Sequence, residues 1–160
     1  MIVVSDSSPI IALARASKLH LLRDLFSEVL IPNGVYNELA QEGRAGAEEV
    51  KRGLFIKRER VTIKDTDLSL TERFGQADAE VIILAKKKRP DVFILTDDRP
   101  LIRQAEEEDI SFMTTRGILL EAKSQGFITN VKEIMDEMRR QGVGVENEDY
   151  EDTLRQAGEK

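Results

Sequence analysis

The N-terminal stretch Ile2-Val-Val-Ser-Asp6-Ser-Ser-Pro9 contains a complete strand-to-helix junction. Residues 2–5 are a short apolar run, typical of a strand that is covered on both faces. The run ends at Asp6, after which Ser8 is a favourable helix N-cap and Pro9 a favourable first helical residue. We therefore predict a buried strand that passes directly into a helix.

The rest of the chain repeats this alternation of short strands and helices. We predict further strands at residues 28–31, 55–57, 92–96 and 110–113, of which 92–96 is the clearest. Helices are predicted near residues 10–16, 17–26, 33–39, 47–52, 71–88, 101–108, 115–125, 130–142 and 150–157. Thr115 and Asn130 are the predicted N-caps of the helices at 115–125 and 130–142. Strands separated by helices indicate an α/β fold with a mostly parallel central sheet and helices on both faces. Because no repeat or linker interrupts the pattern, we expect a single domain over residues 1–160.

Composition limits the chemistry that the chain can perform. Of its 160 residues, 41% are apolar and 34% charged, which is typical of a globular protein. The chain has no cysteine, and His20 is its only histidine, which excludes thiolate zinc sites, cysteine nucleophiles and multi-histidine metal sites within one chain. A bound metal would need oxygen ligands, which favours Mg²⁺ or Mn²⁺.

The N-terminal sequence and the net charge lead to expectations about the cellular location of the protein and about its binding to nucleic acid. The N-terminus lacks the basic start of a signal peptide, and no apolar run approaches the ~20 residues that span a bilayer, so we expect a cytoplasmic protein. The net charge of −6 argues against a protein that coats nucleic acid non-specifically. Basic residues cluster at 51–52, 57–60, 86–89 and 139–140. These clusters are explained by helix ends, although together they would also suit the rim of an acidic pocket.

Acidic residues follow two of the predicted strands. Asp6 ends the first strand, and Asp97 and Asp98 follow the strand at 92–96. In a parallel sheet, these carboxylates would lie at the same edge, where functional groups gather. Crowded carboxylates raise one another's pKa unless a cation lies between them. The alternative is that each Asp only caps a helix or forms a turn.

Two more carboxylates are predicted beside the core. Glu38 is next to Leu39 in a helix, and Asp78 shares a helix face with Ile82. A lone carboxylate beside the core costs several kcal/mol of desolvation unless it is paired or bound to a metal. The alternative is an ion pair with Arg or Lys. Glu80 projects elsewhere on the helix of Asp78 and is a weaker candidate.

The stretches that carry these acids resemble the four motifs of PIN domains, and more closely those of a prokaryotic PIN subfamily related to VapC-type toxins. They are Val3-Val-Ser-Asp6-Ser-Ser-Pro-Ile-Ile-Ala-Leu-Ala14, Ile31-Pro-Asn-Gly-Val-Tyr-Asn-Glu38-Leu39, Gln76-Ala-Asp78-Ala-Glu-Val-Ile-Ile-Leu-Ala85 and Phe93-Ile-Leu-Thr-Asp-Asp98-Arg-Pro-Leu101. Residues from about 129 to 160 resemble the helical C-terminal extension of that subfamily. The resemblance thus covers nearly the whole chain.

The resemblance implies a three-layer α/β/α fold and an endoribonuclease that depends on Mg²⁺ or Mn²⁺. The implied catalytic and metal-binding residues are Asp6, Glu38, Asp78, and Asp98 or Asp97. The family's fourth motif is usually Thr-x-Asp, which selects Asp98, but Asp97 directly follows Thr96 and stays a candidate. The resemblance also implies an RNA substrate, a toxin neutralised by a small antitoxin protein, and a homodimer.

Three other classes of protein fit the sequence less well. A haloacid-dehalogenase-like phosphohydrolase needs a second acid two residues after the first, where Ser8 stands. A receiver-type signalling domain needs an acidic pair at its first strand end, but Ser7 follows Asp6. A catalytically inactive PIN-like module that binds RNA or protein remains the alternative, and the retained acids argue against it.

Overall fold

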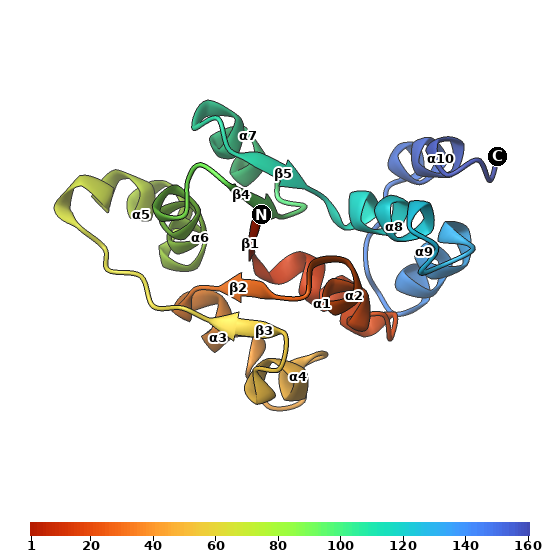
Figure 1. Ribbon diagram of the computed structural model, residues 1–160, viewed down its shortest axis with the longest axis horizontal. Helices are drawn as coiled ribbons and strands as arrows, with labels where there is room; N and C mark the ends of the chain where they lie inside the picture. The colour runs from red at the N-terminus through yellow and green to blue at the C-terminus, as the bar shows by residue number, and fades with distance from the viewer.

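The computed structural model describes residues 1–160 and contains a five-stranded sheet in the order β3-β2-β1-β4-β5 (Figure 1). Every neighbouring pair of strands is parallel, so the predicted mostly parallel sheet is confirmed and is in fact wholly parallel. All five predicted strands are present, each within a residue of its expected position. They are β1 (Ile2–Ser5), β2 (Val29–Ile31), β3 (Ile56–Arg58), β4 (Val92–Leu95) and β5 (Ser111–Met113).

Helices connect the strands and extend the chain beyond the last of them. They are α1 (Ser7–Arg15), α2 (His20–Phe26), α3 (Asn33–Leu39), α4 (Ala47–Arg52), α5 (Leu68–Phe74), α6 (Gln76–Lys87), α7 (Arg99–Glu107), α8 (Thr115–Ser124), α9 (Val131–Arg140), α10 (Asn147–Gln156) and the 3₁₀ turn η1 (Asp65–Asp67). None of these helices is long and apolar enough to cross a membrane.

The sheet lies between two layers of helices, which confirms the predicted three-layer α/β/α fold. The connections from β1 to β3 run through α1 to α4, and the chain then crosses back through α5 and α6 to β4. Right-handed crossovers in opposite directions along a sheet place their helices on opposite faces. On one face, the ring of Phe26 from α2 contacts Phe93 edge-on at 5.4 Å between centroids.

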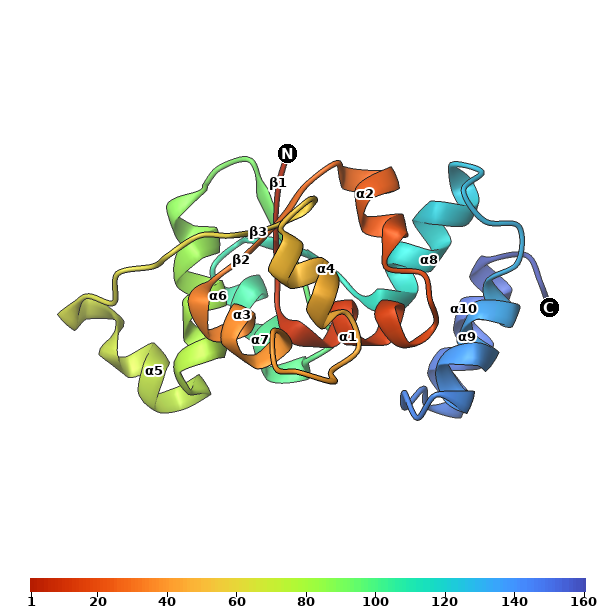
Figure 2. The ribbon, with the colours of Figure 1, turned by 90° about the horizontal axis from the view of Figure 1, so that it is seen from below.

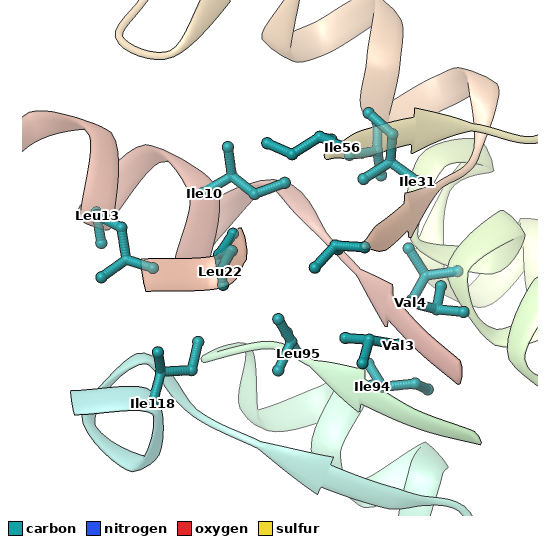
Figure 3. Close-up of a cluster of buried hydrophobic side chains, with 14 of the residues drawn as sticks. Val3, Val4, Ile10, Leu13, Leu22, Ile31, Ile56, Ile94, Leu95 and Ile118 are labelled. Carbon is teal, nitrogen blue, oxygen red and sulfur yellow. The ribbon is translucent and has the colours of Figure 1, made fainter. Parts of the chain in front are cut away.

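A single contiguous core joins the sheet to both helical layers. Figure 3 shows side chains from β1, β2, β3 and β4 meeting those of α1, α2 and α8 in this core. The core also includes residues of the last two helices, namely Val131, Ile134, Met135, Met138, Tyr150 and Leu154. In Figure 2, α9 and α10 lie at one end of the molecule and α5 at the other.

Three predicted helix starts or lengths are wrong in detail. Asp6, and not Ser8, caps α1, because its carboxylate accepts the N–H of Ser8. Thr114, rather than Thr115, caps α8 through the N–H of Gly117. The predicted helix at 71–88 is divided into α5 and α6 at Gly75, whose φ of 80° suits glycine. By contrast, Asn130 caps α9 as predicted.

Candidate active site

Asp6 is buried at the carboxyl end of β1, with 5% of its surface exposed. Its Oδ2 accepts a hydrogen bond of 2.5 Å from the hydroxyl of Thr96, and its Oδ1 accepts the backbone N–H of Ser8 at 2.8 Å and the Ser8 hydroxyl at 3.0 Å. Burial raises the pKa of Asp6 to about 6, against the lowering effect of these hydrogen bonds, and Asp78 raises it further. Asp6 is thus held rigidly, but its charge is not neutralised.

Asp78 is half-buried in the first turn of α6. Burial raises its pKa, and the negative charges of Asp98 and then Glu38 raise it further. Asp78 also raises the pKa of Asp6. Asp78 therefore interacts electrostatically with three other carboxylates, those of Asp6, Glu38 and Asp98, at the carboxyl edge of the sheet.

Glu38 is exposed, which corrects the expectation that it borders the buried stripe of α3. The α3 helix buries Val35 and Leu39, and Glu38 turns away from them. Its Oε2 accepts a hydrogen bond of 2.9 Å from the hydroxyl of Ser7, the first residue of α1. This contact directs Glu38 toward the start of α1, beside Asp6, rather than into the core.

Asp97 and Asp98 have different partners. The carboxylate of Asp97 accepts the N–H of Thr115 at 2.7 Å and its hydroxyl at 2.6 Å. The carboxylate of Asp98 accepts only the N–H of Leu101, at 3.1 Å, and caps α7. Since a carboxylate offers about four lone-pair sites, one capping bond leaves Asp98 able to bind a cation. Asp98 therefore fits the site better than Asp97.

Thr96 was not among the residues that the sequence selected. Its buried hydroxyl donates to Asp6 and accepts the N–H of Asp98 at 3.0 Å. It thereby fixes the ends of β1 and β4 relative to each other. The Thr-x-Asp spacing of the fourth motif was the signal that pointed to this position.

Glu80 lies in the interior, with 3% of its surface exposed, and it is turned toward α3. Its carboxylate accepts the backbone N–H of Gly34 at 2.7 Å and the side-chain amide of Gln76 at 3.2 Å. A Cβ on Gly34 would lie 2.8 Å from the Cα of Ala77, so the two helices meet backbone to backbone. Glu80 and Gly34 together set the position of α3, which carries Glu38, against α6, which carries Asp78.

No Arg or Lys neutralises the acidic cluster. The ion pairs of the chain include none of the candidate acids, so the alternative of structural ion pairs does not apply. The basic residues at 86–89 end α6 near the start of β4, at the opposite end of this helix from Asp78. There Lys88 pairs with Glu59, and Lys86 and Arg89 pair with Glu108. This cluster is a helix end and does not flank the acids.

The donor set fits a hard divalent cation, because every available ligand is a carboxylate oxygen and the carboxylates repel one another. The side chains as they stand form no group of three or more ligands around a single point. Binding of an ion would therefore require rotation of at least one carboxylate, for which the exposed Glu38 and the half-buried Asp78 have room.

The fold and the site define a parallel α/β protein with clustered carboxylates at the carboxyl edge of its sheet. A family model described as PIN domain matches residues 2–159, and the chain belongs to this family. PIN domains are generally nucleases and typically use divalent metal ions. No curated protein matches the sequence.

Proposed function

We propose that this protein is an endoribonuclease that hydrolyses RNA phosphodiester bonds with Mg²⁺ or Mn²⁺. The observation that carries the proposal is the cluster of Asp6, Glu38, Asp78 and Asp98, in which no carboxylate has a basic partner and burial raises the pKa of two. Unneutralised carboxylates at one edge of a parallel sheet are costly for the fold alone and are explained by cation binding.

In this proposal, each residue has a separate part. Asp6 is the central ligand, because Thr96 and Ser8 fix its position. Asp78 and Asp98 complete the ligand set. Glu38, oriented by the Ser7 hydroxyl, ligates directly or positions the attacking water. When bound, the metal lowers the pKa of a water and stabilises charge on the phosphate and the leaving oxygen.

The proposal is tested by incubating mixed-sequence single-stranded RNAs with the protein in Mn²⁺, in Mg²⁺ and in EDTA. Wild type should cut in either metal and not in EDTA, and Asp6→Asn should lose most of the activity while keeping the N-cap of α1. Asp109→Asn is the matched control, because Asp109 is exposed and precedes β5 at the opposite edge of the sheet. Cutting that persists in Asp6→Asn would refute the assignment.

The same assay separates the ribonuclease from the alternative of a binding module. An inactive PIN-like module would bind RNA or a partner protein and leave every RNA intact in both metals. The unneutralised acids favour the enzyme, because a binding surface for RNA gains nothing from clustered negative charge.

Two narrower proposals rest on the resemblance to VapC-type toxins. One is that the ribonuclease is the toxin of a toxin–antitoxin pair, in which case expression of wild type should arrest growth and expression of Asp6→Asn should not. The other is that it works as a homodimer, which light scattering of the purified protein tests directly.

A further inference from the structure

A cavity of about 330 Å³ lies beside the acidic cluster. Its walls come from the start of α7, the start of α8, Met138 of α9, the loop residues 143–146 and the first turn of α10. Figure 1 shows α8, α9 and α10 grouped beyond β5, so the C-terminal helices supply one wall of a space that begins at the carboxyl edge of the sheet.

The cavity connects to the acids through a short chain of contacts. Asp97 lines the cavity, and its backbone N–H approaches the Ser8 hydroxyl at 3.4 Å. That hydroxyl donates in turn to Asp6. Arg99, which also lines the cavity, directly follows Asp98 in the chain. A single-stranded RNA whose scissile phosphate lies at the acids would therefore place a neighbouring nucleotide at this cavity.

Two arginines, Arg99 and Arg116, line the cavity, and each contacts an acidic residue of the C-terminal segment. Arg116, of which 29% of the side chain is exposed, lies 3.6 Å from Asp149 and donates to the Thr153 hydroxyl at 3.4 Å. Arg99 lies 3.7 Å from Glu146, and both of these side chains are more than two-thirds exposed, at 72% and 76%. An ion pair so exposed is weak and easily exchanged. Arg116 is thus fixed, and Arg99 is free to change partners.

We infer that this cavity is a subsite for a backbone phosphate of single-stranded RNA, bound by Arg99 and Arg116. The inference rests on the proposed ribonuclease function and extends it. A protein of net charge −6 with unpaired acids at its site repels RNA, so cationic groups must hold the strand close by. The guanidinium fork suits a phosphate, and Glu146 occupies Arg99 until the RNA displaces it.

The basic residues at 86–89, Arg58 and Arg140 do not offer the same arrangement. The cluster at 86–89 lies at the opposite end of α6 from Asp78 and is tied to Glu59 and Glu108. Arg58 stacks over the ring of Tyr36 at 4.3 Å, and Arg140 pairs with Glu137 in α9. Arg99 and Arg116 are the arginines that share a cavity with Asp97.

The test measures RNA binding apart from cleavage. A labelled mixed-sequence single-stranded RNA is titrated with full-length Asp6→Asn protein in Mg²⁺, and anisotropy gives the dissociation constant at several salt concentrations. In this background, Arg99→Ala should weaken binding by about tenfold, as expected for one charge-assisted contact. It should also make the salt dependence shallower by about 0.7 in logarithmic slope. Glu146→Gln should tighten binding about two- to fivefold, because a competing carboxylate is removed.

The control is the exposed pair of Arg140 and Glu137, because substituting these residues makes the same changes of charge outside the cavity. Arg140→Ala and Glu137→Gln should leave affinity within about twofold. The inference is overturned if the Asp6→Asn protein does not bind the RNA, if Arg99→Ala binds as tightly as its parent, or if Arg140→Ala weakens binding equally. If the ribonuclease proposal fails, the cleavage assay shows intact RNA with wild type. If only the subsite fails, wild type still cleaves RNA, and Arg99→Ala leaves the binding affinity unchanged.

Discussion

The carboxylate of Asp97 accepts both the backbone N–H and the hydroxyl of Thr115, at 2.7 and 2.6 Å. These two bonds tie the loop after β4 to the start of α8. Since Asp97 is committed to this contact, Asp98 is left as the acid that acts on Asp78. The relationship gives two consecutive aspartates separate tasks, one structural and one in the acidic cluster.

Substitution of the two aspartates should therefore have opposite effects on activity and stability. Asp98→Asn should abolish RNA cleavage with little loss of stability, because asparagine still caps α7. Asp97→Asn should retain cleavage but lower the free energy of unfolding by about 1–3 kcal/mol, through weaker bonds to Thr115. Urea unfolding and the cleavage assay measure the two quantities. Loss of cleavage in Asp97→Asn at full stability would reverse the assignment.

Gly34 should be intolerant of any side chain, although it is not one of the candidate acids. In Gly34→Ala, the new Cβ would meet the Cα of Ala77 at 2.8 Å, so α3 must move away from α6. We expect a loss of about 1–3 kcal/mol in stability and a fall in cleavage, because Glu38 moves with α3. Gly144→Ala is the control for unfolding, since nothing lies within 4 Å of its added Cβ. Equal unfolding free energies for the two variants would contradict the close contact.

The contribution of Asp6 to the stability of the metal-free protein should fall as pH rises. The pKa of Asp6 is about 6 in the folded protein and 3.8 ordinarily, so between these values the folded state binds more protons than the unfolded state. The contribution of protonated Asp6 to the free energy of unfolding is complete below pH 4 and is lost as pH rises through about 6. It amounts to up to roughly 3 kcal/mol. Urea unfolding in EDTA should show Asp6→Asn gaining stability relative to wild type between pH 4 and pH 7. A constant difference across that range would contradict the raised pKa.

The C-terminal helices should unfold together with the sheet, as expected for a single domain over residues 1–160. Leu154 in α10 is 4% exposed and belongs to the common core. Leu154→Ala should lower the free energy of unfolding by about 2–5 kcal/mol in one transition, seen alike by circular dichroism and fluorescence of an attached dye. Arg155→Ala, which alters an exposed neighbour, should change it little. If α10 unfolded in a separate, earlier transition, it would not belong to the same cooperative domain as the sheet.

Local patterns in the sequence predicted the strands and the class of fold. The apolar runs at β1 and β4 mark buried strands because a parallel sheet is covered on both faces. Each run is also followed by aspartate, and parallel strands bring their carboxyl ends to one edge of the sheet. The class of fold and the placing of Asp6 near the Asp97–Asp98 pair were therefore predicted from spacing, whereas the preference for Asp98 came from the family resemblance.

Side-chain direction could not be predicted in the same way. Periodicity placed Glu38 beside the core, yet it is exposed and held by Ser7, because the direction of a side chain depends on how its helix packs. Glu80 is buried against the N–H of Gly34, a partner 46 residues away in the sequence. The Thr-x-Asp spacing pointed to Thr96, but its bond to Asp6, like that of Thr115 to Asp97, joins distant segments, and no local pattern specifies these partners.

Calorimetric titration of Mn²⁺ into the metal-free protein near neutral pH tests whether the carboxylates bind a divalent cation. Wild type and the Asp109→Asn control should bind with a saturable isotherm. Asp78→Asn should bind at least about tenfold more weakly, because one of a few anionic oxygen ligands is lost. If wild type shows no saturable binding, or if Asp78→Asn binds as tightly as wild type, the acidic cluster is not a metal site.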